Sequence, residues 1–200
     1  MEDKKQKYYD RLKNNLVGHE IKEIFYNKMN YGNDIENWNL SQNIHSIDMD
    51  VIFKMKNNKL VQVNWDNEFY SYGINIKGLN KINNIEGFKT IDLTSNSKWI
   101  KLLNKKILNV QVFWYIEKNV KEKMYDNNKN ISEKSIQIEI PQTLEIRFET
   151  NDKIWISALE ILKDNKINYC TDNLTIFFNE EELLKYKLTR HTNTIYLIKS

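Results

Sequence analysis

The sequence is poor in the residues that most often cross-link or bend a chain. Its only cysteine, Cys170, excludes an intrachain disulfide and a multiple-cysteine zinc site, and we expect a structural thiol in a reducing compartment. The only proline is Pro141, and the five glycines, at positions 18, 32, 73, 78 and 87, are isolated. No GxGxxG or GxxxxGK loop exists, which argues against enzymes that cradle phosphates.

Long hydrophobic runs and a leader segment are also missing. No window approaches the roughly 20 apolar residues that a membrane-spanning helix needs. The first ten residues, MEDKKQKYYD, lack the apolar stretch of a secretory signal. We therefore expect a cytoplasmic protein without a membrane partner.

Alanine and arginine are scarce as well. The chain has one alanine, Ala158, and three arginines, against 29 asparagines, 26 isoleucines and 27 lysines, a skew typical of an A+T-rich genome. The net charge is only +3, and basic residues alternate with acidic ones even in the most basic stretch, 101–134. Because a phosphate-binding surface requires clustered Lys and Arg, the sequence disfavours nucleic acid as a partner.

What the chain does have is apolar residues, 40% of the total, arranged mostly with a period of two. Such alternation is typical of half-buried strands. It is clearest at 51–55, 61–65, 110–114, 136–140, 144–148 and 154–158. The pattern predicts an α+β protein that is predominantly antiparallel β.

One pattern occurs twice. Residues 50–65 match residues 143–158 without a gap at an offset of 93, so that Trp65 aligns with Ala158 and both are expected in the core. Shorter matches follow in the same order, 16–24 with 102–110 and 73–76 with 173–176. We interpret this as an internal duplication; the alternative is that any two amphipathic hairpins look alike.

The duplication predicts two tandem homologous units, 1–90 and 91–200, as two domains or as one compact domain. Each unit should have a short helix and a β-hairpin sheet, and a C-terminal helix and strand should complete the second. A three-residue loop at 57–59 would pair Met55 with Val61, apolar with apolar, and the second hairpin should follow the same rule.

Other elements are short or irregular. Helices are expected at 5–15, at 97–104 and from an N-cap at Asn179 to about residue 188, and a last strand at 194–199. Between the first strand and the hairpin of each unit, we expect long and potentially functional loops at 27–43 and 117–134.

No motif predicts an enzyme, a cofactor or a metal centre. GxSxG and HExxH are absent, and His19, His45 and His191 lie far apart and are expected on the surface or in loops. On an extended strand, Asp48 and Asp50 would share a face and could supply two cation ligands. We prefer to interpret them as the polar alternates of a strand. A catalytic set assembled from distant acids stays open.

A protein-binding surface has the best local signal. Residues 65–73, WDNEFYSYG, mix aromatic and acidic side chains, as protein interfaces do, whereas the second unit has ALEILKDNK at this place. The candidates for partner binding are Trp38 from the first long loop and Asp48, Asp50, Asp66, Glu68, Tyr70 and Tyr72.

A resemblance to known proteins extends over residues 16–183. It rests on four segments, LVGHEIKEI, IDMDVIFKMKNNKLVQVNW, SALEI and NLTIFFNEEE. The chain resembles small bacterial β-rich proteins, several of which are similar to immunity proteins of polymorphic-toxin or contact-dependent inhibition systems. The resemblance implies a non-enzymatic inhibitory partner of another protein, a toxin domain being one candidate. The alternative is a small-molecule or nucleic-acid binding module of a bacterial defence or regulatory operon. Oligomeric state is left open by the sequence.

Overall fold

The computed structural model describes residues 2–30, 32, 38–82, 86–125, 131–162, 164–186, 188 and 192–199, with the backbone alone at 117, 119, 121–125, 131–134, 170 and 192–199. One sheet has the order β6 (Gly73–Leu79), β5 (Leu60–Asp66), β4 (Asp50–Met55), β1 (Ile21–Met29), β7 (Phe88–Asp92). The other has the order β12 (Thr192–Lys199), β8 (Ile107–Tyr125), β9 (Ile131–Phe148), β10 (Lys153–Ile161), β11 (Ile167–Phe177), β3 (Ile44–Ile47), β2 (Asn39–Ser41). All pairs among these strands are antiparallel, which confirms the predicted fold class.

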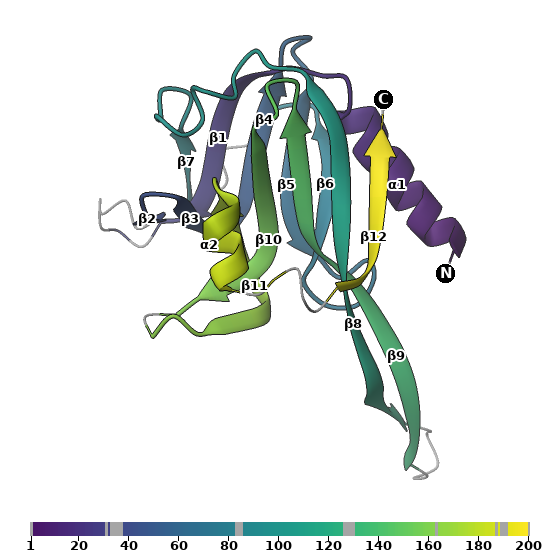
Figure 1. Cartoon of the computed structure of the whole chain (residues 1–200). Coiled ribbons are helices and arrows are strands. Elements are labelled where there is room, and N and C mark those ends of the chain that lie inside the picture. The colour runs from purple at the N-terminus through teal and green to yellow at the C-terminus, as the bar shows by residue number, and fades with distance from the viewer. Residues whose placement is uncertain are drawn as a thin grey trace.

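The two sheets face each other across one core (Figure 1). Alternate side chains point inward, so that Phe53 of one sheet and Ile146 of the other are fully buried. Both predicted units contribute to this core, and β7 spans the boundary between residues 90 and 91. The division into 1–90 and 91–200 stays a prediction.

Helix α1 (Glu2–Leu16) confirms the helix predicted at 5–15. Its apolar side, with Tyr8, Leu12 and Leu16 fully buried, packs into the core beside β6 and β8 (Figure 1). The helix therefore lies along β6, the outermost strand of the five-stranded sheet.

Helix α2 (Glu180–Lys185) begins where the sequence predicts, because Asn179 Oδ1 accepts a hydrogen bond from Glu182 N at 2.9 Å. It ends at Lys185, before the predicted end at 188. Its Leu183 packs in a second apolar cluster with Trp155, on the opposite face of the seven-stranded sheet from the main core.

Residues 97–104 form successive turns, so the helix predicted there is wrong. The segment is closed off at Asn104, whose left-handed φ of 58° ends any helical run and whose N–H donates to Ile21 O at 2.8 Å. Trp99 and Leu102 are nevertheless buried, as expected for a segment that packs on the sheets.

The two hairpins share one register, but it differs from the predicted one. Phe53 pairs with Val61 instead of Val63. The reason is Asn58, which takes a left-handed φ of 65° and closes a loop that starts one residue earlier, as Asn151 does with the same φ in the second hairpin. A shift of two residues keeps every side chain on its predicted face.

The two halves of the fold, one with β1 and β4–β7 and the other with β8–β12, form corresponding backbone contacts. Gly18 N donates to Ile107 O, and Asn104 N, at the sequence offset of 86, donates to Ile21 O, both at 2.8 Å. The strand order β6-β5-β4-β1-β7 has its counterpart in β11-β10-β9-β8-β12. The correspondence includes the bulge near Ile21 and the one near Ile107.

The halves differ in the segment inserted between their first two core strands. In the first half, β3 crosses to the other sheet and pairs with β11, Ile47 opposite Leu174. In the second half, residues 116–125 and 131–142 of β8 and β9 continue as a two-stranded ribbon that projects from the body (Figure 1). The loop expected at 117–134 is therefore wrong for its described residues, because strand pairing continues through them.

Pro141 marks the base of this ribbon. It lies opposite Trp114 beside a bulge of β9 at Gln142, a place where a strand tolerates a missing N–H. Beside it, the Gln142 side chain donates to Ala158 O at 2.9 Å, where the pairing of β9 with β10 ends. Ala158 is fully buried, as its alignment with Trp65 predicts.

Candidate functional site: the Tyr70 surface

The turn between β5 and β6, residues 67–72, is held by its own polar side chains. Asp66 Oδ1 accepts from Glu68 N at 2.9 Å, and Asn67 Oδ1 accepts from Tyr72 N at 3.1 Å. Short polar side chains that bond to nearby backbone N–H groups fix the path of a turn. The backbone under Tyr70 is therefore set before any partner arrives.

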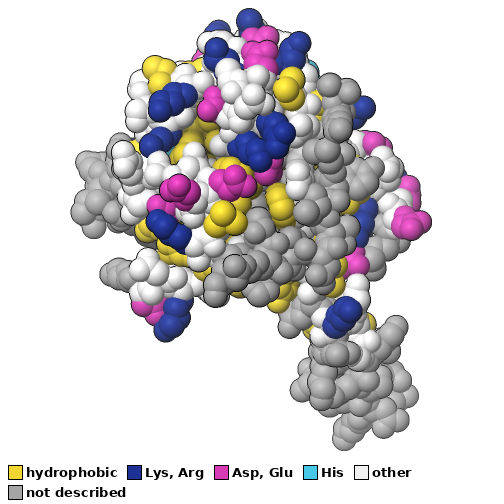
Figure 2. Space-filling view, in the orientation of Figure 1, with side chains coloured by type: hydrophobic (Ala, Val, Ile, Leu, Met, Phe, Trp, Pro, Cys, Tyr) yellow, Lys and Arg dark blue, Asp and Glu magenta, His cyan; other side chains and the backbone are white. Residues whose placement is uncertain are grey.

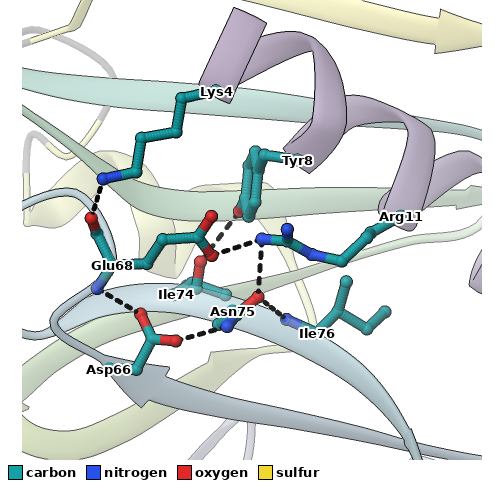
Figure 3. A network of polar contacts seen from close by, with 8 residues as sticks. All are labelled: Lys4, Tyr8, Arg11, Asp66, Glu68, Ile74, Asn75 and Ile76. Atoms are coloured by element: carbon teal, nitrogen blue, oxygen red, sulfur yellow. Dashed lines mark hydrogen bonds and ion pairs between the residues drawn. The ribbon is translucent and has the colours of Figure 1, made fainter. Parts of the chain in front are cut away.

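Helix α1 supports the turn from the side (Figure 3). Arg11 pairs with the Glu68 carboxylate and donates to Asn75 Oδ1 at 3.2 Å, while Asn75 donates to Asp66. Lys4 donates to the Glu68 carbonyl. The carboxylates of Asp66 and Glu68, both expected to meet a partner, are thus engaged in hydrogen bonds and an ion pair within the chain.

The two aromatic residues at the tip of the turn have different surroundings. Phe69 packs edge-to-face against Tyr8 of α1 and Trp114 of β8, with ring centroids 5.3 Å and 4.9 Å away. Its neighbour Tyr70 is 42% exposed. Phe69 therefore anchors the turn to both halves of the fold, and Tyr70 stands on that anchor.

Two hollows flank Tyr70. One, of about 410 Å³, is lined by Lys4, Phe69, Tyr70, Ile136, Gln137, Ile138 and Glu139. The other, of about 450 Å³, is lined by Asn67, Tyr70, Ser71 and Tyr72. We call these residues the Tyr70 surface. In the first hollow, a hydrogen bond from Lys5 holds the pKa of Glu139 below its usual value, so this carboxylate is ionised and already paired.

Tyr72 and Trp65 form the far side of this surface. Their ring centroids lie 5.2 Å apart, and both side chains are half-buried. Trp65 packs against the core cluster but is not enclosed by it, so its expected place in the core is only partly correct.

Trp38 lies away from the Tyr70 surface. It is only 8% exposed and packs edge-to-face against Tyr26 and His45. Its ring therefore belongs to the core, and its contact with a partner stays a prediction. A tryptophan in a polar sequence context gave no indication of this burial.

Asp48 and Asp50 do not share the face of an extended strand, because Asp48 lies in a bend between β3 and β4. Asp48 accepts from Met29 N at 3.2 Å. Asp50 is 6% exposed and accepts hydrogen bonds from Asn27 and Gln62 at 2.9 and 2.7 Å. Burial raises its pKa to about 6, against the lowering effect of these bonds. Neither carboxylate belongs to the Tyr70 surface.

His45 is buried, contrary to the surface position expected for it. Trp99 donates to the Tyr26 hydroxyl at 2.7 Å, and that hydroxyl lies 2.8 Å from His45 Nδ1. A hydroxyl can accept two hydrogen bonds or accept one and donate one, so the tautomer of His45 decides which group donates in the Tyr26–His45 bond. Burial, with a contribution from Lys98, lowers the His45 pKa to about 4, so the ring is neutral at pH 7. This chain of bonds joins residues too far apart in sequence to be predicted.

A further hollow of about 510 Å³ lies between the β2 edge and α2. It is lined by Leu40, Ser41, Ile44, Asn165, Glu182, Lys185 and Tyr186. Its charged residues, Glu182 and Lys185, pair with each other at 2.7 Å along the helix. Their charges therefore balance each other.

Charge is mixed over the described part of the face in Figure 2, where Lys and Arg lie among Asp and Glu. Among the described residues, no group of three or more His, Cys, Asp or Glu is placed to hold a metal ion. Neither described helix has the length and apolar character to cross a membrane. Cys170 and His191 have side chains outside the described residues.

No protein-family model, no curated protein and no solved structure matches the chain. Function must therefore be argued from the geometry of the Tyr70 surface.

Proposed function

We propose that this chain is a cytoplasmic bacterial protein that binds and blocks another protein, as immunity proteins block their cognate toxins, with no chemistry of its own. The observation that carries the proposal is Tyr70, an exposed aromatic side chain between two hollows on a turn that is fixed from below. Tyrosine supplies a large contact area with few rotatable bonds and is enriched among residues that dominate binding energy.

The support beneath Tyr70 strengthens this proposal. Ordering a loop on binding costs free energy, which a turn already held by Arg11, Asn75 and Phe69 largely avoids. The acids of the turn hold its shape rather than offer free charge. We therefore expect a partner that contributes apolar side chains, and a complex that depends only weakly on salt.

We also propose that the two halves arose by duplication of one unit, so that the Tyr70 turn is a specialisation of the first copy. The support is the recurrence of hydrogen bonds at constant offsets, for example Asn58 N to Met55 O and Asn151 N to Phe148 O. Co-expression of residues 1–94 and 95–200 as separate chains tests this. Two units that each carry a complete strand set should reassociate, and failure of both to fold together would count against it.

The function is tested with toxin domains encoded next to this gene. Cells arrested by the cognate toxin should be rescued by the wild type, and the two proteins should co-purify. Tyr70→Ala should weaken the complex at least about tenfold, as loss of a dominant contact does. The matched control is Leu162→Ala, which truncates an exposed residue of the corresponding turn in the second half, 39% exposed, and should change nothing.

Failure of rescue against every neighbouring toxin would remove the proposal. A gel shift with nonspecific RNA or DNA that disappears at high salt would instead favour the nucleic-acid alternative.

A further inference from the structure

A small hollow beside the second hairpin is lined mainly by basic residues. Its volume is about 200 Å³, below the roughly 300 Å³ at which sites for drug-sized molecules begin, so it suits a small ion. Leu102 and Ile154, both buried, belong to its apolar lining. We call it the lysine hollow, and its polar lining consists of Asn43, Lys98, Lys101, Asp152 and Lys153.

Two of the three amines have no carboxylate partner within the described chain. Lys98 Nζ donates to the neutral Asn43 Oδ1 at 2.7 Å. Lys101 is exposed and forms no hydrogen bond or ion pair with the described residues. Lys153 pairs with Glu145 at 3.2 Å, but Glu145 does not line the hollow. Because ammonium groups around one small hollow repel each other, an anion between them would be stabilised.

The lining as a whole has a surplus of positive charge. Its one carboxylate, Asp152, accepts a hydrogen bond from Thr150 and can offset only one of the three lysines. The charge of Lys98 also reaches the neighbouring core, where it adds to the lowering of the His45 pKa that burial mainly causes. The positive potential of the hollow is therefore not cancelled by its own lining.

The first half is closed at the equivalent place. At the offset of 86, the two unpaired lysines occupy the positions of Leu12 and Asn15, which α1 buries. Lys59 of the first hairpin donates to Asn14 O of this helix at 3.1 Å, whereas at the offset of 93 the second hairpin has Asp152 instead. A carboxylate cannot donate to a carbonyl, so the second hairpin lacks this contact.

We propose that the lysine hollow is a binding site for a small oxyanion of the phosphate type, held by the amines of Lys98 and Lys101 with Lys153 at its side. Such an anion accepts a charge-assisted hydrogen bond from each amine and offsets their charge. Amines that stay partly in water contribute only about 1 kcal/mol each, so the expected Kd is on the order of 1 mM at low salt. No residue of the Tyr70 surface lines this hollow, so the site does not rest on the proposed function.

The test is an NMR titration of the full-length protein at about pH 7.5 with sodium phosphate up to about 20 mM, a range that brackets the expected Kd. Sodium chloride at the same ionic strength is the reference. The amides of Lys101, Leu102 and Ile154 should shift and saturate with phosphate and not with chloride. A second titration uses adenosine monophosphate: an equal Kd identifies the free ion as the ligand, and a Kd at least about tenfold lower identifies a phosphate ester.

Matched variants separate this site from general attraction to a basic protein. Lys101→Met keeps the aliphatic stem and should raise the Kd for either probe at least about fivefold, whereas Lys106→Met removes the same charge outside the hollow and should change it less than about twofold. Asp152→Asn removes the one carboxylate of the lining and should lower the Kd at least about twofold. Shifts that do not saturate, equal losses in the two lysine variants, or a Kd that Lys101→Met leaves unchanged would each overturn the proposal.

Discussion

The two halves follow one strand order but cover their last core strands differently. In the second half, β11 is covered by another strand, with Leu174 paired to Ile47. In the first half, the equivalent strand β6 is covered by helix α1, and the Ile74 carbonyl accepts its hydrogen bond from the Tyr8 hydroxyl at 2.9 Å. The same unpaired edge is thus satisfied once by backbone and once by a side chain.

This difference explains why only one turn became a candidate site. The helix that covers β6 carries Arg11 to the 67–72 turn, where it fixes Glu68 and Asn75. The corresponding turn in the second half ends a hairpin closed by Asn165 N to Leu162 O at 2.9 Å. Helix α2 lies near this turn, but its charged residues Glu182 and Lys185 pair with each other. The fixed 67–72 turn with its exposed Tyr70 is therefore a consequence of the way in which α1 covers the β6 edge.

The largest expected effect tests what the halves share. Met55→Lys and Phe148→Lys each place a charge at equivalent, fully buried core positions, and each should lower the free energy of unfolding by at least about 4 kcal/mol. Lys54→Met, on the other face of the same strand, should change it by less than about 1 kcal/mol. Urea unfolding followed by circular dichroism measures all three. Two halves of unequal tolerance would break the comparison.

The second effect tests a difference between equivalent positions, since the buried Asp50 of the first half has the neutral Thr143 as its counterpart in the second. The raised pKa of Asp50, about 6 against 3.8, means that the folded state binds its proton more tightly, so stability falls as pH rises from 3.8 to 6. The lowered pKa of His45, about 4 against 6.5, has the opposite sign, so stability falls as pH drops from 6.5 to 4.

Each shift of about two units is worth about 3 kcal/mol over its window, so in the wild type the two contributions largely cancel. Relative to the wild type, Asp50→Asn should lose about 3 kcal/mol between pH 6 and pH 4, and His45→Gln should gain a similar amount over the same range. The measurement is urea unfolding at half-unit pH steps. Thr143→Val is the control, because that position does not titrate and should follow the wild-type slope.

The sequence predicts the inward faces well, because alternation depends on neighbouring residues alone. It misses contacts that depend on distant pairing: Arg11 meets Glu68 across 57 positions, and Tyr26 of one sheet meets His45 of the other. The predicted register of the hairpins is also wrong by two residues. The left-handed φ of Asn58, which sets this register, has no signature in the alternation of apolar and polar residues. The sequence indicates Tyr70 because it lies in an acid–aromatic stretch. It does not indicate that the acids of this stretch support the turn, because that role depends on distant residues such as Arg11.

A smaller effect tests how the β6 edge is closed. Tyr8→Phe removes the hydroxyl that bonds to Ile74 O and should cost about 1–2 kcal/mol, because a buried carbonyl loses its partner. Amide exchange should speed up in β6 and stay unchanged in β11, whose edge is held by β3. Equal exchange in both strands would show that α1 does not protect this edge.

The smallest effect sharpens the comparison most, because it concerns one residue type with one φ at equivalent places. Asn58 and Asn151 both have φ of 65°, a region that costs other L-residues roughly 1–2 kcal/mol and asparagine less. Asn58→Ala and Asn151→Ala should each lower stability by about 1 kcal/mol, and glycine at either site should be near neutral. The two losses should agree within about 0.5 kcal/mol and add in the double variant, since the sites share no partner. If only one of the two alanine variants loses stability, the hairpins have the same backbone shape but not the same energetic cost for it. The two halves would then be equivalent in geometry alone.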